Sequence, residues 1–202
     1  KLAVKRLDSI LGIFAKRIGR DRKARRLPVA VLSSAAFRAR AGSSASGGVY
    51  DRRLGWLLLD GAPPKAKEIG GSVARALAAA FCARRYGAAP PWLELGVIEF
   101  LAEAAIKGPA EDHVKILRND GRWDPSTWGE LFALDRVGLR GGQRITVARC
   151  WVMFAALKPA RFAKHLTAAQ RGKIIAAPAL NVPKVEDAIA KFLEGIKLPE
   201  DE

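Results

Sequence analysis

Apolar residues recur at helical spacing in several parts of the chain. Over residues 7–18 they fall at every third or fourth position, at Leu7, Ile10, Leu11, Phe14 and Ile18. This pattern predicts an amphipathic helix with one face packed on a core. By the same criterion we expect helices over 72–81, 92–106, 145–157, 160–166 and 183–196. Asp124 and Pro125 form a helix-start signature, so a further helix is predicted from 124 to about 132.

Short apolar runs in the first third of the chain predict strands. Residues 27–32 are apolar throughout, which favours a strand buried on both faces, with Pro28 tolerated only at its start. The apolar pair Val49-Tyr50 and the run 56–59 flank a turn around 51–55, and they predict a hairpin. A few early strands followed mostly by helices indicate an α+β fold.

Length and composition are those of one globular domain over residues 1–202. The chain has 202 residues, of which 50% are hydrophobic, enough for a sizeable core. We expect a basic amphipathic helix and connection over 1–26, strands over 27–60 and a mainly helical part over 72–202. No apolar run approaches the roughly 20 residues that cross a bilayer, so no transmembrane helix is predicted. Because the chain begins at Lys1, we expect a processed product.

The net charge is +15 and is unevenly distributed. Residues 1–26 hold ten Lys and Arg against two Asp, a local charge of +8. A basic patch is expected at Lys16, Arg17, Arg20, Arg22, Lys23, Arg25 and Arg26. It suggests attraction to polyanions, although no helix-turn-helix, zinc-finger or RNP motif accompanies it. A basic polyanion- or nucleic-acid-binding protein of helical fold is therefore one functional alternative.

The most informative stretch is 72–101. It contains a helical segment, Ser72 to Phe81, with Ser72 as its expected N-cap, a Gly/Pro break over 86–91, and a second helix that opens Trp92-Leu-Glu-Leu-Gly-Val-Ile-Glu-Phe100. This layout resembles the peptidase-MA-like branch of the gluzincin metallopeptidases. In that family a helix with H-E-x-x-H precedes, after a short turn, a helix with a W-L-N-E-G-x-A-E-Y-type string. The runs 27–38 and 48–60 resemble the family's first strand and hairpin.

The positions that bind zinc in the family hold apolar residues in this chain. In the register fixed by Trp92, Val73 and Leu77 occupy the places of the two His, Ala74 that of the general-base Glu, and Leu95 that of the third ligand. No His occurs between 72 and 101, so family-type zinc chemistry, which needs His and carboxylate ligands, is not expected, and neither is any other cofactor.

The resemblance implies a zincin-like fold in which a small N-terminal sheet packs on an active-site-type helix pair, with a mostly helical C-terminal half. It further implies a non-catalytic binding or structural module, an extracytoplasmic location, and a protein partner or larger assembly. An enzyme is the less favoured interpretation. A hydrolase that uses other chemistry in the same cleft is the remaining alternative.

Four residues are candidates for lining such a cleft: Arg75, Trp92, Glu94 and Glu99. Arg75 is expected to point away from the cleft; if it pointed inward, it could bind an anion. The glutamates at 94, 99 and 103 are expected to be solvated or paired with Arg, because their spacing on one helix does not make two carboxylates face each other across a substrate. The two histidines, His113 and His165, lack a partner motif, and either could be a surface residue.

Two cysteines, Cys82 and Cys150, leave two interpretations open. Both fit as buried small hydrophobic residues on helices, and in an oxidising compartment they could form one disulfide. Nothing around either suggests a catalytic triad.

Overall fold

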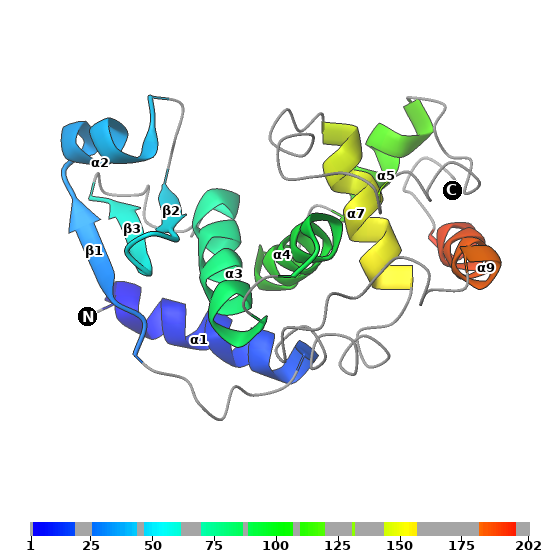
Figure 1. The fold of residues 1–202 in the computed structure, drawn as a ribbon, viewed down its shortest axis with the longest axis horizontal. Helices are drawn as coiled ribbons and strands as arrows, with labels where there is room; N and C mark the ends of the chain where they lie inside the picture. The colour runs from blue at the N-terminus through cyan, green and yellow to red at the C-terminus, as the bar shows by residue number, and fades with distance from the viewer. Residues whose placement is uncertain are drawn as a thin grey trace. The chain divides into compact units, whose positions relative to one another are not determined.

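The computed structural model describes residues 2–18, 26–43, 47–61, 70–86, 89–106, 110–119, 131, 144–156 and 182–196. The predicted helix over 160–166 lies outside these ranges, as does the one over 124–132 apart from Leu131. The fold is mixed α+β, mostly helical, with one three-stranded sheet among the described residues (Figure 1). No described helix is long and apolar enough to cross a membrane.

The chain divides into two compact units. Unit 1 comprises Lys1–Gly87 and Leu101–Lys107, and unit 2 comprises Ala88–Phe100 and Gly108–Glu202. Unit 1 contains α1 (Leu2–Ile18), β1 (Val29–Leu32), α2 (Ser34–Ala41), β2 (Gly48–Asp51), β3 (Trp56–Asp60) and α3 (Gly71–Tyr86). Unit 2 contains α5 (Ala110–Asn119), α7 (Arg144–Ala156) and α9 (Val182–Glu194). Helix α4 (Pro91–Ile106) contributes its first part to unit 2 and its last turns to unit 1.

The sheet of unit 1 has the strand order β1-β3-β2. Strand β1 pairs parallel to β3 with Val29 opposite Leu57, and β2 pairs antiparallel to β3. The predicted hairpin is confirmed. Its turn is held by the Asp51 carboxylate, which accepts hydrogen bonds from the backbone N–H groups of Arg53 (2.9 Å) and Leu54 (3.1 Å). Gly55 supplies the positive φ, 70°, that the turn requires.

Strand β1 lies where the sequence places it, but the prediction that it is buried on both faces is wrong. Val29 is 41% exposed and Val31 is 67% exposed. The reason is topological: β1 is an edge strand, and the helix on this face, α3, packs chiefly on β2 and β3. An unbroken apolar run is typical of a strand in the middle of a covered sheet. Here the middle position belongs to β3, whose Leu57 and Leu58 are buried.

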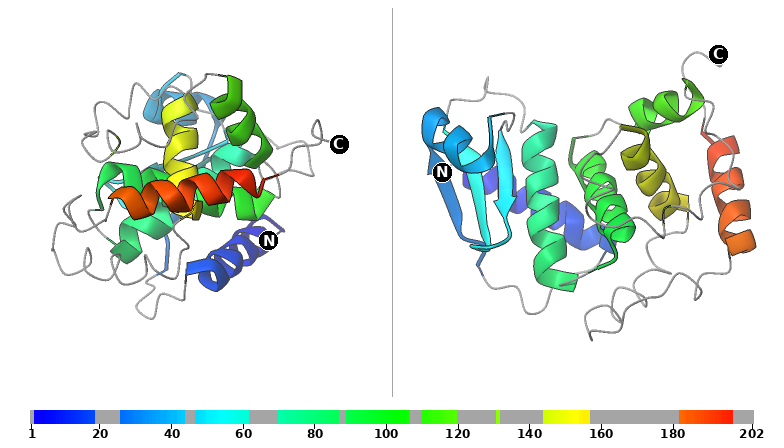
Figure 2. Two further views of the ribbon diagram at one scale, coloured as in Figure 1. Left: turned by 90° about the vertical axis from the view of Figure 1, so that its right-hand side faces the viewer. Right: turned by 45° about the horizontal axis from the view of Figure 1, so that its top comes forward.

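Helices cover both faces of the sheet. Leu59 and Asp60 follow each other on β3, so their side chains point to opposite faces. Leu59 lies on the α3 side, next to Gly48 and Val73, and Asp60 accepts a 2.7 Å hydrogen bond from Ser34 Oγ of α2. Figure 2 shows the sheet with α2 and α3 beside it.

Helix α2 was not predicted from the sequence. Ser33 caps it by accepting a hydrogen bond from the backbone N–H of Ala36 (3.3 Å), and Phe37 is its one large buried side chain. One large apolar residue in eight gives no period to recognise, so only the capping serine marked the helix.

Helix α1 confirms the predicted amphipathic segment and extends it to Leu2. Its stripe of Leu7, Ile10, Phe14 and Ile18 is buried. The Phe14 ring packs edge-on against Phe81 of α3, with ring centroids 5.8 Å apart. At the end of α1, Arg85 Nη2 donates a 3.3 Å hydrogen bond to the carbonyl of Ile18, which satisfies one of the acceptors left open at a helix C-terminus.

Unit 2 is a helical assembly around α7. Helix α7 contacts α5 and α9, and its residues from Ala148 to Phe154 are all buried. Helix α4 approaches α7 very closely at Gly96, because a Cβ at that position would lie 2.5 Å from the carbonyl oxygen of Cys150 and 2.9 Å from Cβ of Phe154. One turn further along α4, the Phe100 ring packs edge-on against Phe154 at 5.2 Å.

Replacing Gly96 with alanine is therefore expected to destabilise the protein by ~1–3 kcal/mol, since backbone must move to admit the methyl group. Gly12 provides the matched control. It lies in the middle of α1, where a Cβ would meet no atom within 4 Å, so Gly12→Ala is expected to stabilise by ~0.5–1 kcal/mol. Urea denaturation of both variants measures the two changes. Equal effects of the two substitutions would contradict the close α4–α7 approach.

Candidate functional site

The residues at the expected zinc-site positions of α3 are packing residues. Ala74 and Leu77 are fully buried. Val73 lies against strand β2: a Cβ on Gly48 would be 3.2 Å from Val73 Cα and 3.3 Å from its Cγ2. This face of the helix therefore lies in the core of unit 1, in contact with the sheet.

Two glycines of the loop and strand before the hairpin allow this contact. Gly47 has a φ of 69°, and a Cβ on it would clash with Ser72 Oγ. Gly48 carries no side chain where the strand passes Val73. The helix begins one residue earlier than predicted, at Gly71, and the N–H groups of Val73 and Ala74 donate to the carbonyl of Gly70. Ser72 is thus inside the first turn and is not the N-cap.

The candidate residues fall into two groups. Val73, Ala74, Arg75 and Leu77 belong to unit 1, and the α4 residues from Trp92 to Glu99 belong to unit 2. Within unit 2, Trp92 is buried, whereas Glu94 and Leu95 are half-buried. Val, Ala and Leu side chains carry no donor atom for a metal. Among the residues that the structure describes, no group of three or more His, Cys, Asp or Glu side chains could hold an ion.

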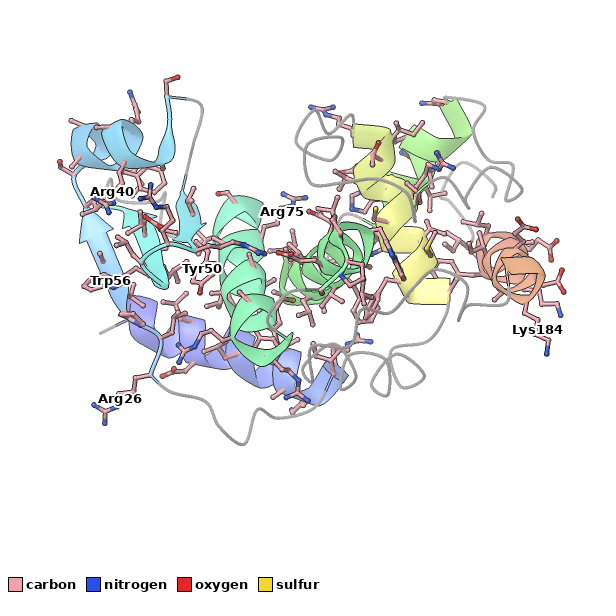
Figure 3. All side chains as sticks on the ribbon, viewed as in Figure 1. Arg26, Arg40, Tyr50, Trp56, Arg75 and Lys184 are labelled. Atoms are coloured by element: carbon pink, nitrogen blue, oxygen red, sulfur yellow. The ribbon has the colours of Figure 1, made fainter. Side chains whose placement is uncertain are left out.

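Arg75 is half-buried on the first turns of α3 (Figure 3). Its guanidinium folds back along its own helix, so that a Cβ on Gly71 would lie 3.1 Å from Nη1. Arg75 is also engaged in a further interaction. An arginine held in this way near the helix start is available for anions only after it leaves these contacts.

Glu99 and His113 form a buried pair in unit 2. Glu99 of α4 is 3% exposed and His113 of α5 is 5% exposed, with His113 Nε2 3.5 Å from Glu99 Oε2. The His113 ring also stacks at a tilt on Trp151 of α7, with ring centroids 5.3 Å apart. Neither ring nitrogen of His113 has a hydrogen-bond partner within the described part of the chain. Glu99 is therefore not solvated, and the expectation that His113 could be a surface residue is wrong.

Sequence reasoning missed this pair because it missed α5. The apolar spacing of α5 could have predicted it. His113, Val114 and Leu117 lie on one side of this helix, which begins directly after Pro109, and all three are buried. The other histidine, His165, lies outside the described residues.

Arg149 of α7 adds a third buried polar side chain to unit 2. Its charge and that of Glu99 both act on the Cys150 thiol, with opposite effects on its pKa. A carboxylate that orients an imidazole is a general-base arrangement. Because Glu99 and His113 are shielded from solvent, a substrate could reach them only after the helices move. The Glu99–His113 pair connects α4 to α5, and the ring contact between His113 and Trp151 connects α5 to α7.

Cys82 and Cys150 are both free and buried, in units 1 and 2 respectively. Burial raises the pKa of the Cys150 thiol from its ordinary 9.0 to about 12, against the opposing effect of Arg149. Burial likewise raises the pKa of Cys82, with Arg52 and Arg85 opposing. Both thiols are therefore protonated at neutral pH, and a protonated thiol is a poor nucleophile.

The expected basic patch is described only in part. Lys16, Arg17 and Arg26 are exposed. The remaining members, Arg20, Arg22, Lys23 and Arg25, lie outside the described residues.

Comparison with known proteins identifies no relative of this chain. The sequence matches no protein-family model, and neither a curated protein nor a solved structure is significantly similar to it.

The burial of Ala74 leads to a direct test. Ala74→Glu returns the carboxylate expected of a peptidase and is predicted to cost ~3 kcal/mol or more, because Ala74 is fully buried and the substitution would bury an unpaired charge. Ala79→Glu, at a half-buried position of the same helix, is the matched control and is expected to cost ~1 kcal/mol or less. Chemical denaturation measures both. A well-tolerated Ala74→Glu would show that this face of α3 is open to solvent.

Proposed function

We propose that this chain is a non-catalytic, peptidase-like domain of zincin-like fold that acts as a binding module. The observation that carries the proposal is the complete burial of Ala74 and Leu77. These are the positions at which the resemblance requires a general base and a ligand. A zinc peptidase needs them polar and open to a metal-bound water.

The arrangement of unit 1 supports the fold part of the proposal. A small sheet packs on α3 through β2 and β3, and β2 runs past the first turn of the helix. The end of α4 returns to the start of α3, since a Cβ on Gly71 would lie 3.6 Å from Ile106 Cδ1. A sheet over a helix that is followed by a second, adjoining helix is the layout that the resemblance implies.

A hydrolase with other chemistry is less well supported. The candidate acid, Glu99, and its neighbour His113 are both shielded from solvent, and burial keeps both thiols protonated. Binding requires none of these groups, and unit 1 exposes large apolar side chains on its sheet.

Metal analysis together with a protease assay tests the proposal. The purified chain is predicted to contain far less than one zinc per molecule after incubation with zinc and desalting. It is also predicted to release no more fluorescence from a labelled casein than buffer does. A one-to-one zinc content with cleavage that a chelator abolishes would overturn the proposal. Cleavage that survives chelation would point instead to the hydrolase alternative and would equally refute a non-catalytic role.

A further inference from the structure

Among the described residues, no strand pairs with β1 on the side away from β3. It is the terminal strand of the sheet, and two of its apolar side chains, Val29 and Val31, are exposed. We name these two residues, with their backbone groups, the β1 edge. In most proteins such an edge is shortened, charged or covered, because it can pair with another chain. The β1 edge carries no charge of its own.

The hydrogen-bond pattern shows which backbone groups the β1 edge presents. Leu57 N donates to the carbonyl of Pro28 at 3.0 Å, and Gly61 N donates to that of Leu32 at 2.6 Å. In a parallel ladder alternate residues direct their backbone groups to the partner strand, so Pro28, Ala30 and Leu32 face β3. The N–H and C=O groups of Val29 and Val31 therefore point outward.

The surroundings of the β1 edge are basic. The start of β1 lies beside the start of β3, and hence near the β2–β3 turn, because Val29 pairs with Leu57. Exposed Arg26 precedes β1, and exposed Arg53 lies in that turn. Between residues 26 and 61 five Arg face only two Asp, which gives this segment a net charge of +3.

Both aspartates of this segment are already engaged. Asp51 accepts two backbone hydrogen bonds in the turn and lies 3.7 Å from Arg40 Nε, and Asp60 accepts from Ser34. Figure 3 shows Arg26, Trp56 and Arg40 along the β1 side of unit 1. Trp56 and Leu54 add exposed apolar surface near the start of β3.

We propose that the β1 edge binds an acidic, extended polypeptide segment as a fourth strand of the sheet. The main-chain groups of Val29 and Val31 provide hydrogen bonds, and alternate apolar side chains of the segment cover the two valines. Acidic residues of the segment lie at the Arg26 and Arg53 end, where opposite charge speeds association and sets the direction of binding. The inference rests on the proposed function only in treating the chain as a binding module.

Fluorescence anisotropy with synthetic peptides tests this inference. The probe is a labelled peptide of alternating valine and threonine with aspartates at one end. Two matched peptides serve as controls, one with lysines in place of the aspartates and one with N-methylated backbone on its pairing edge. The acidic peptide is expected to bind, and each control at least about tenfold more weakly.

Variants of the chain separate the contribution of the backbone hydrogen bonds to affinity from that of the charges. Val31→Pro removes an outward N–H without touching the ladder to β3 and is expected to weaken binding about tenfold. Arg26→Glu is expected to weaken binding about fivefold and to reduce its salt dependence. Val31→Asp retains the N–H but repels an acidic segment, so it tests the same edge if the proline variant does not fold. Ala35→Asp, an exposed position on α2, is the surface control and should leave affinity unchanged.

The possible outcomes distinguish this inference from the proposed function. No binding by folded, zinc-free protein would overturn the inference alone, and so would affinity that Val31→Pro and Val31→Asp leave unchanged. Tight binding of single-stranded DNA with a steep salt dependence, and none of the acidic peptide, would assign the surface to nucleic acid and refute it. Cleavage of the bound peptide, seen by mass spectrometry, would overturn the proposed function while leaving the strand addition in place.

Discussion

Strand β2 passes the first turn of α3 so closely that a side chain larger than hydrogen at position 48 would meet the backbone of Val73. Gly47, in a left-handed conformation, brings the chain into this position, where a Cβ would clash with Ser72. Through this contact the sheet packs on α3. The apolar face of α1 also packs on α3, through Phe14 and Phe81. The arrangement of unit 1 therefore depends on two adjacent glycines and on the small and apolar residues that α3 presents to them.

The same packing fills the positions of α3 at which the resemblance implies a zinc site. A helix that binds zinc must leave ligands and a metal-bound water open to a substrate. On α3 the corresponding stretch is closed by packing, with Ala74 and Leu77 out of contact with solvent. Unit 2 has the buried polar side chains Glu99, His113 and Arg149, and the first two form a pair between α4 and α5. Unit 1 exposes the edge of its sheet at β1. This edge has outward backbone groups, exposed valines and neighbouring arginines.

Much of the fold could be predicted from the sequence wherever a long period or a turn signature was present. The apolar stripe predicted α1, and the Gly/Pro breaks predicted where α3 and α4 end or begin. The turn over Asp51–Gly55 predicted the hairpin. The two short helices were not predicted, because α2 has only one large buried apolar residue and α5 has only ten residues. The Glu99–His113 pair could not be foreseen, because its second member lies on the missed helix. Burial of β1 was overestimated, since strand order is a long-range property that a short apolar run such as 27–32 does not encode.

Because α3 serves as a packing element, we expect it to have no affinity for metal in the native state. A ligand that binds only the folded protein must raise its stability as the ligand concentration rises. Urea denaturation in the presence of increasing zinc, and separately after chelation, is therefore the most direct measurement. The same unfolding midpoint is expected under all these conditions. A midpoint that climbs steadily with zinc and falls on chelation would contradict it.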